Sequence, residues 1–283
     1  MGVMTKDMKN NGAPARKPVT KRGPGRPSAS QGNNVSRETI LNTAFELART
    51  VPLQDLSIVL VAKELGITPA LIHYYIGGRD WLTSGIMNLF YREMVENWPQ
   101  PTARWEVDIF ELATVIYNRY VKYSGVAAYA VSHNHFRVFQ LLQEGEHDYG
   151  VEFLELYTGR MMEAGLCAER TAIYGHMLLE FIISNAHSLI KHRHPHEYVN
   201  FIQERVEELD PKHYPAIHFT RLTLSDFDGA AAFSEGCRLI LLGMQSEQLR
   251  TALDGGVQRP PQTTAEEAQA LRRASQPSSA KRN

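Results

Sequence analysis

Residues 56–82 decide the fold and have the sequence LSIVLVAKELGITPALIHYYIGGRDWL. Two short helical patterns lie on either side of Gly66, a residue type that easily adopts the positive φ at which a helix ends. Thr68 is a typical N-cap for the second helix, and Pro69 follows at the first helical position, where a missing N–H costs nothing. The stretch therefore predicts a helix, a tight turn and a second helix. This geometry places a recognition helix in the major groove of DNA, although it is also that of an ordinary corner in an all-helical protein.

The charge distribution favours the DNA-binding interpretation. Residues 1–34 carry seven basic side chains against one acidic side chain, a net charge of +6, and residues 254–283 carry five against three. Because the whole chain has a net charge of −1, residues 35–253 carry −9. An acidic body with a basic arm suits a protein that contacts a polyanion at one end.

The basic arm, residues 1–33, has almost no large apolar side chain, so we expect it to be disordered in the free protein. It contains Lys21-Arg22-Gly23-Pro24-Gly25-Arg26-Pro27, whose Gly-Arg-Pro core resembles an AT-hook. In an AT-hook, an arginine enters the narrow and strongly negative minor groove of A·T-rich DNA. Arg22 and Arg26 are therefore candidate minor-groove contacts, and the alternative is a basic tail that only keeps the protein soluble.

A further helix precedes the opening stretch. Ser36 is its expected N-cap, its apolar residues recur at helical spacing as far as Arg49, and Val51-Pro52 ends it. We expect this helix and the two that follow to enclose one small core. The expected core residues are Phe45, Leu56, Val61, Leu65, Ile67 and Ile72.

Residues 37–82 resemble the DNA-binding domain of TetR-family transcriptional regulators. The residues that carry the resemblance are Arg37, Ile40, Leu41, Ala44 and Leu47, then Val61-Ala62-Lys63-Glu64-Leu65-Gly66-Ile67, and finally Leu71-Ile72-His73-Tyr74-Tyr75 with Arg79 and Leu82. The sequence departs from the family at His73, where a Tyr is usual, at Ile76, where a Phe is usual, and at Gly77-Gly78. The resemblance implies a three-helix helix-turn-helix domain over residues 34–94.

The same resemblance implies the residues that contact DNA, which are Thr68, Pro69, Ala70, Leu71, His73, Tyr74, Tyr75 and Arg79. The leading residues of the recognition helix would face base edges, with a hydroxyl at Thr68 and apolar side chains that suit a thymine methyl. His73, Tyr74 and Tyr75 would reach phosphates or bases. Arg79 would bind a phosphate near the start of the next helix.

Residues 95–253 form a second, larger helical domain by the same periodicity argument. The expected helices cover residues 80–97, 105–124, 126–144, 147–165, 168–191 and 229–250, the first of which connects the two domains. Residues 210–228 are expected to be a polar loop, and residues 254–283 a disordered tail apart from a short helix at 264–274.

The helices at 168–191 and 229–250 are apolar on almost all faces, which indicates deep burial or an interface shared with a partner. The order of the segments also resembles, more loosely, the C-terminal regulatory domain of the tetracycline-repressor branch of the family. That resemblance implies a homodimer held together by these two helices. The two-fold symmetry of such a dimer predicts a palindromic operator in double-stranded DNA.

The second domain is rich in Tyr, Phe, Met and Trp, a composition that suits a pocket for a small apolar or aromatic effector. Each such residue is also an ordinary core candidate. The pocket candidates are Tyr91, Met94, Trp98, Trp105, Tyr117, Tyr120, Phe136, Met161, Met177 and Phe181.

Other functional classes lack their signals. The sequence has no nucleophile elbow, phosphate loop, paired-carboxylate site or CxxC, so we expect no catalytic residues, no enzyme activity and no cofactor. Residues 192–196 are rich in histidine, but Pro195 breaks the helix and we expect no metal site. Cys167 and Cys237 are expected to be reduced core residues. No apolar run reaches the roughly 18 residues of a membrane span, and we expect a cytoplasmic bacterial protein that is nucleoid-associated when bound.

These observations predict an all-α, dimeric, ligand-responsive transcriptional regulator. The leading hypothesis is a repressor that an effector releases from its operator. The alternative is an architectural DNA-binding protein that uses the arm and the helical domain without a small-molecule effector.

Overall fold

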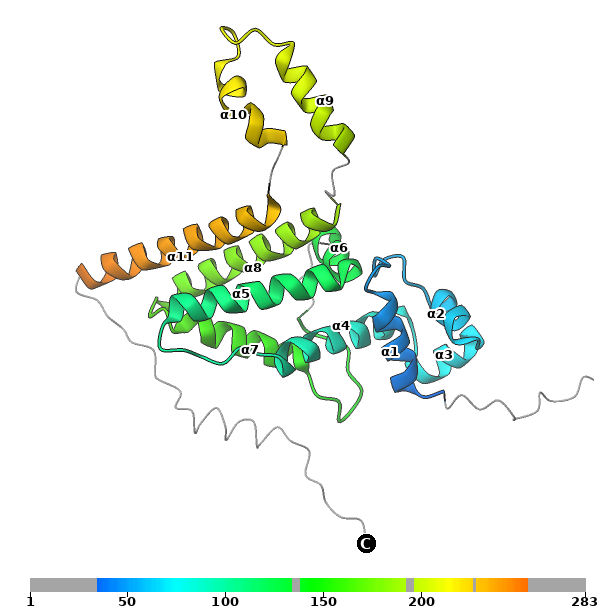
Figure 1. The fold of residues 1–283 in the computed structure, drawn as a ribbon. Helices are drawn as coiled ribbons and strands as arrows, with labels where there is room; N and C mark the ends of the chain where they lie inside the picture. Colours follow the sequence, from blue (N-terminus) through cyan, green and yellow to red (C-terminus); the bar gives the residue numbers. More distant parts are fainter. Residues whose placement is uncertain (1–34, 134–137, 192–195, 226–227, 254–283) are drawn as a thin grey trace, which may run out of the picture. The chain divides into compact units, whose positions relative to one another are not determined.

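The computed structural model of the protein describes residues 35–133, 138–191, 196–225 and 228–253. Within these ranges every regular element is a helix, which confirms the predicted all-α class (Figure 1). The predictions for the arm (residues 1–33) and the tail (residues 254–283) concern residues outside the described part.

The first three helices are α1 (Arg37–Leu47), α2 (Ile58–Leu65) and α3 (Pro69–Ile76). Each has the N-cap that its sequence favours: the side-chain oxygens of Ser36, Ser57 and Thr68 each accept a backbone N–H from the first turn. Gly66 ends α2 with φ 66°, and its N–H donates to the carbonyl groups of Ala62 and Lys63. The predicted helix, turn and helix are therefore confirmed.

Most of the residues predicted for the core of this three-helix unit are buried in the structure. Ile40, Phe45, Leu56, Val61 and Ile72 are buried. Two further residues expected in the core, Leu65 and Ile67, are only half-buried.

Helix α4 (Arg79–Glu96) joins the three-helix unit to the rest of the chain. Its first half packs on α1, and its second half packs on α7 (Tyr149–Met162). The ring centroid of Phe153 in α7 lies 5.1 Å from that of Tyr91 and 6.0 Å from that of Trp98. The predicted helix at 80–97 is therefore present, and it contacts both the three-helix unit and the rest of the chain.

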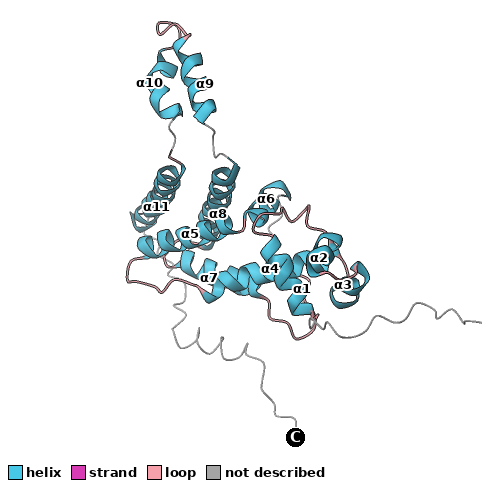
Figure 2. Ribbon diagram, turned by 45° about the vertical axis from the view of Figure 1, so that its right-hand side comes forward, coloured by secondary structure: helices cyan, strands magenta, loops and turns pink. Residues whose placement is uncertain are grey.

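The larger helical body consists of α5 (Trp105–Lys122), α6 (Ser124–His133), α7, α8 (Ala168–Lys191) and α11 (Gly229–Leu253). Helices α5, α8 and α11 lie side by side in both ribbon views (Figures 1 and 2). The rings of Tyr117 in α5 and Phe233 in α11 stack with centroids 4.1 Å apart. The predicted boundaries of α5, α7, α8 and α11 agree with the structure to within a few residues.

The predicted helix at 126–144 is wrong at residues 138–144, because residues 138–148 form a loop, and residues 134–137 lie outside the described part of the chain. The side chain of Asn88 in α4 holds this loop: it donates to the carbonyl oxygen of His147 at 3.0 Å and accepts the N–H of Tyr149 at 3.0 Å. These tertiary hydrogen bonds determine the backbone conformation more strongly than local helix propensity does.

The predicted loop at 210–228 is also wrong, because residues Pro215–Ser225 form helix α10. Asp210 makes the turn before it, since its backbone carbonyl accepts the N–H groups of His213 and Tyr214. Pro215 then occupies the first helical position, where proline is well tolerated. Helix α10 packs against α9 (His196–Glu207), a helix that the sequence did not predict.

Candidate DNA-binding surface

Helix α3 has one exposed face and one buried face. Ile72 and Ile76 are buried in the three-helix core, and Leu71 and Tyr75 are half-buried. The exposed positions are the N-cap Thr68 and, within the helix, Pro69, Ala70, His73 and Tyr74, which share one side at i, i+1, i+4 and i+5 spacing. The structure therefore brings together five of the eight predicted contacts in the described part of the chain.

The side chain of Tyr74 is strongly exposed, with a relative accessibility of 81%. Its ring stands edge-on to the ring of Tyr75, with centroids 5.2 Å apart. A large aromatic side chain that is left exposed on a monomeric surface is available for contact with a binding partner.

His73 makes two hydrogen bonds with Gly77 at the end of α3. Its carbonyl oxygen accepts the N–H of Gly77 at 2.9 Å, and its Nδ1 lies 2.7 Å from the carbonyl oxygen of Gly77. Gly77 has φ 100°, a value that favours glycine. The bond at Nδ1 fixes the imidazole ring while the side chain stays exposed.

Arg79 is exposed at the first position of α4, and its guanidinium donates to the carbonyl oxygen of Gln54 in the loop between α1 and α2. The predicted phosphate ligand therefore also holds this loop. Arg22 and Arg26 lie outside the described residues.

The three-helix unit is joined to the body at both ends of α1. At the C-terminal end, the N–H groups of Ser124 and Gly125 donate to the carbonyl oxygens of Arg49 and Ala48 at 3.1 and 3.0 Å. The N–H of Leu53 donates back to the carbonyl oxygen of Gly125 at 3.3 Å. The start of α6 is thus hydrogen-bonded directly to the corner that follows α1.

At the N-terminal end of α1, the guanidinium of Arg37 pairs with the carboxylate of Glu146 at 3.1 Å. Glu146 belongs to the loop 138–148 that Asn88 also holds. A rearrangement of the body would therefore act on α1 from both ends. The sequence had given no signal for either junction, since each joins residues far apart in the chain.

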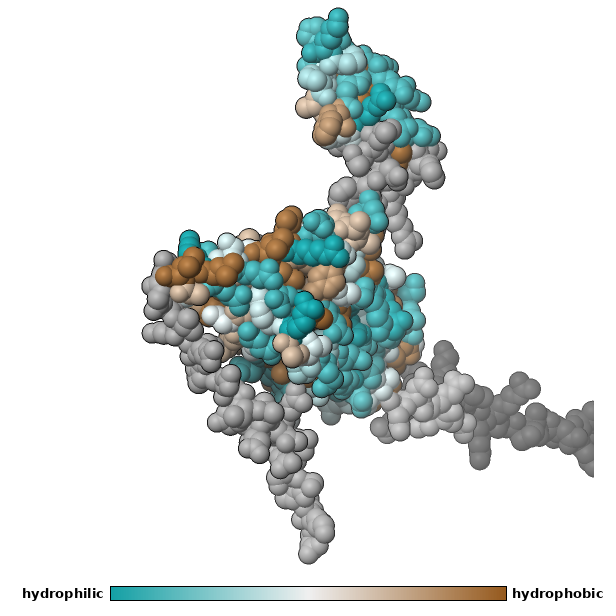
Figure 3. All heavy atoms as spheres, turned by 60° about the vertical axis from the view of Figure 1, so that its left-hand side comes forward, coloured by the Kyte–Doolittle hydropathy of each residue, from teal (hydrophilic) through white to brown (hydrophobic). Residues whose placement is uncertain are grey.

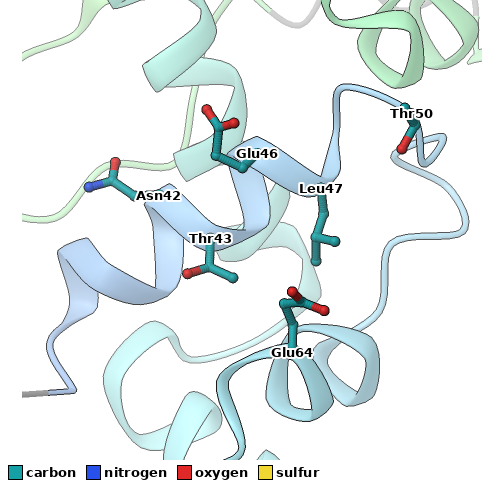
Figure 4. Close-up of a pocket in the computed structure, with 6 residues that line it drawn as sticks. All are labelled: Asn42, Thr43, Glu46, Leu47, Thr50 and Glu64. Atoms are coloured by element: carbon teal, nitrogen blue, oxygen red, sulfur yellow. The ribbon is translucent and has the colours of Figure 1, made fainter. Parts of the chain in front are cut away.

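An open depression lies between α1 and α2 (Figure 4). Its lining includes the carboxylates of Glu46 and Glu64. Glu46 is paired with Arg49 at 2.9 Å. Carboxylates repel DNA phosphates, so this depression does not suit a phosphate-binding surface.

The structure distributes the predicted effector-pocket residues over several places. Tyr91, Met94, Tyr120 and Met161 are buried in the body, where burial raises the pKa of both tyrosine hydroxyls and keeps them neutral. Phe136 lies outside the described residues. The remaining five candidates are half-buried, stacked on an aromatic ring or placed at the surface. Trp98 and Trp105 are half-buried, Tyr117 stacks on Phe233, and Met177 and Phe181 line an open groove between α8 and α11.

The outer faces of α8 and α11 carry exposed apolar side chains. On α8 they include Ile173 and Met177, and on α11 they include Leu239, Leu242 and Leu249. Figure 3 shows hydrophobic side chains gathered over the region of α11. An apolar stripe along two adjacent helices is the surface that a partner helix pair would cover.

Other chemistry finds little support in the described part of the chain. Cys237 is buried, and burial raises the pKa of its thiol to about 12, so it stays protonated. Cys167 is exposed, so its predicted core position is wrong. It lies in the turn just before α8, where its own backbone carbonyl accepts the N–H of Thr171. The described side chains include no group of three or more His, Cys, Asp and Glu placed to hold a metal ion. No helix among the described residues is long and apolar enough to cross a membrane.

No protein-family model and no curated protein sequence matches the chain. Solved structures do match it. Apo ActR from Streptomyces coelicolor has a TM-score of 0.62 at 18% identity, over 75% of this chain and 98% of that chain. The TetR-family protein ActR in complex with actinorhodin has a TM-score of 0.63 at 18% identity, over 76% and 97%. SCO7222, a TetR from the same organism, has a TM-score of 0.60 at 19% identity, over 75% and 99%. The chain therefore has the fold of TetR-family transcriptional regulators.

Proposed function

We propose that this chain is a dimeric DNA-binding transcriptional regulator, a repressor that a small apolar or aromatic effector releases from a palindromic operator. The observation that carries the proposal is the exposed face of α3, which follows the Gly66 turn and holds five of the predicted DNA contacts. The fold that the chain shares with TetR-family regulators also supports it. Residues 35–253 carry a net charge of −9, so the basic arm is the part of the chain whose charge attracts a polyanion such as DNA.

In vitro selection from a random duplex library tests the DNA-binding part of this proposal. The full chain should enrich a sequence with two inverted half-sites, because a two-fold dimer presents two copies of α3. Failure to enrich any sequence would contradict the proposal. A single half-site without inverted symmetry would contradict the dimeric arrangement only.

Arg79 offers a prediction about the role of a single contact. Replacing Arg79 by Ala should weaken binding to all DNA sequences by a similar factor, because a phosphate contact carries no base information. The variant also loses the bond to the carbonyl of Gln54, so its unfolding should be measured alongside. Replacing Thr68 by Ala should instead change the preferred sequence. A shift in sequence preference for the Arg79 variant would show that the roles are assigned wrongly.

The apolar stripe on α8 and α11 supports the dimer. Leu239 and Leu242 are 60% and 57% exposed and lie on one side of α11 at i and i+3. Burial of such side chains is the main driving force for the association of helices in water.

A charge on this stripe should dissociate the dimer. Replacing Leu239 by Glu should weaken self-association by at least about 100-fold, because each dimer would bury two unpaired carboxylates. Sedimentation velocity over a range of protein concentrations measures this. The matched control is Leu141 to Glu, at a 47% exposed leucine in the loop 138–148, which should sediment as the wild type does. Equal association of both variants would place the interface elsewhere.

The effector part of the proposal is supported by the aromatic content of the body and by the ActR structures, which share its fold. ActR has been solved in complex with (S)-DNPA and with actinorhodin. An effector releases DNA only to the extent that it binds the released conformation more tightly than the DNA-bound one.

Titration of the protein–operator complex with apolar and aromatic compounds tests this part. A compound that lowers operator affinity, and whose own affinity falls by the same factor in the presence of operator, is expected from thermodynamic linkage. If no compound binds the body while operator binding is intact, the architectural alternative without an effector is favoured.

A further inference from the structure

The exposed face of α3 has an unusual chemistry for a surface that reads DNA. Among Thr68, Pro69, Ala70, His73 and Tyr74 there is no Arg, Lys, Asn or Gln. The two commonest bidentate base contacts, Arg or Lys to guanine and Asn or Gln to adenine, are therefore absent from this face. Sequence discrimination must come from hydroxyl groups, apolar contacts and the one imidazole.

The hydrogen bond to Gly77 determines which nitrogen of His73 carries the proton. A carbonyl oxygen can only accept, so the Nδ1 that lies 2.7 Å from the Gly77 oxygen must be the donor. In a neutral imidazole with Nδ1 protonated, Nε2 has a free lone pair and is a hydrogen-bond acceptor. The exposed edge of His73 thus offers an acceptor.

His73 is also well placed along the helix. It lies on the same face as Pro69, one turn further on and so about 6 Å along the helix axis. The leading turn of a recognition helix meets base edges in the major groove. A side chain one turn behind it faces the next base pairs along the groove.

We propose that His73 is a specificity-determining residue that accepts a hydrogen bond, through Nε2, from the amino group of one adenine or cytosine in each half-site. This inference rests on the proposed DNA-binding function. Only adenine N6 and cytosine N4 donate in the major groove, whereas guanine O6 and N7 and thymine O4 are acceptors. At guanine or thymine, Nε2 of His73 would face another hydrogen-bond acceptor, and the two would repel each other. This position on the contacted strand therefore favours A or C.

The competing interpretation is that the imidazole only closes the end of α3 through its bond to Gly77. Both interpretations predict weaker DNA binding for a variant without the imidazole. They differ in base preference, because a purely structural residue affects all positions of the half-site together.

The first experiment is selection from a random duplex library at pH 8.5, where histidine side chains are ordinarily neutral, with the wild-type chain and with His73→Ala. The wild type should show one position per half-site that accepts A or C. In the variant that position alone should lose its preference while the other positions keep theirs. Selection of the same preferences by both proteins would overturn the inference but leave the proposed function standing. If the wild-type chain selects no DNA, the proposed function fails, and the inference fails with it.

The second experiment tests the proposed hydrogen bond itself, by removing the amino hydrogen of the base that His73 would accept. N6-methyladenine and N4-methylcytosine still pair with their partner bases, and the methyl group replaces the amino hydrogen that faces the major groove. This change at the A or C position should weaken binding of the wild type by about 2- to 12-fold, the worth of one net hydrogen bond, and should leave His73→Ala unchanged. The matched control is the same methylation at another adenine or cytosine of the half-site. A loss of equal size in both proteins would overturn the role of His73.

Discussion

Replacing Arg160 by Met is expected to lower the free energy of unfolding by about 3–5 kcal/mol. Arg160 is buried in α7, and its guanidinium lies 3.5 Å from the carboxylate of Asp108, which is only 2% exposed. It also donates to the carbonyl oxygen of Pro99 at 3.2 Å. Without Arg160, the Asp108 carboxylate would stay buried with only the N–H of Thr102 as a hydrogen-bond donor.

Urea unfolding at pH 7 and a fixed protein concentration measures this effect. Asp108→Asn should lower the free energy of unfolding by less than Arg160→Met does. Arg160 keeps its ion pair with the carboxylate of Glu163 at 3.3 Å, and the asparagine can still accept the N–H of Thr102. The double variant should be more stable than Arg160→Met alone, since no unpaired charge remains. The matched control is Arg205→Met, at an exposed ion pair with Glu208, which should change stability by less than about 1 kcal/mol. Equal losses at Arg160 and Arg205 would contradict this explanation.

Replacing Gly125 by Ala is expected to destabilise the protein by about 3 kcal/mol. A Cβ atom at this position would lie 2.0 Å from the carbonyl oxygen of Val51 and 2.6 Å from that of Ala48. Both are backbone atoms, so the start of α6 would have to move away from α1 and lose the hydrogen bonds that join them. Overpacking against fixed atoms is costly because a close-packed interior has no space to absorb it.

The matched control is Gly159→Ala in the middle of α7, where an added Cβ meets no atom within 4 Å. The free energy of unfolding of this variant should rise by up to about 1 kcal/mol, because alanine is the better helix former. Thermal unfolding of both variants gives the comparison. If Gly125→Ala is as stable as Gly159→Ala, the junction between α1 and α6 tolerates a gap and does not join the two parts tightly.

The local features of the fold could be predicted because they depend on neighbouring residues. Gly66 needs only its own freedom to adopt a positive φ, and Ser36 and Thr68 cap the turns that immediately follow them. Helices α8 and α11 could likewise be predicted, because each is a long apolar segment contained in one window of sequence.

The features that could not be predicted depend on contacts between distant residues. The loop 138–148 takes its conformation from Asn88 and from the Arg37–Glu146 pair, which joins residues 109 positions apart. The sequence at α10 favours a loop, because proline and polar residues surround the start of this helix. Leu71 and Tyr75 are half-buried because they pack toward the core, and the sequence alone does not separate them from the predicted contacts that are exposed.

The central claim is that the exposed face of α3 binds DNA, and a charge placed on that face tests it most directly. Ala70 is exposed in the first turn of α3, so Ala70→Asp should fold normally. Its carboxylate would face DNA phosphates and bases without a partner. Fluorescence anisotropy on the selected operator should therefore show affinity reduced by more than about 100-fold, whereas Ala103→Asp, at an exposed alanine between α4 and α5, should bind like the wild type. Wild-type affinity for Ala70→Asp would contradict the account.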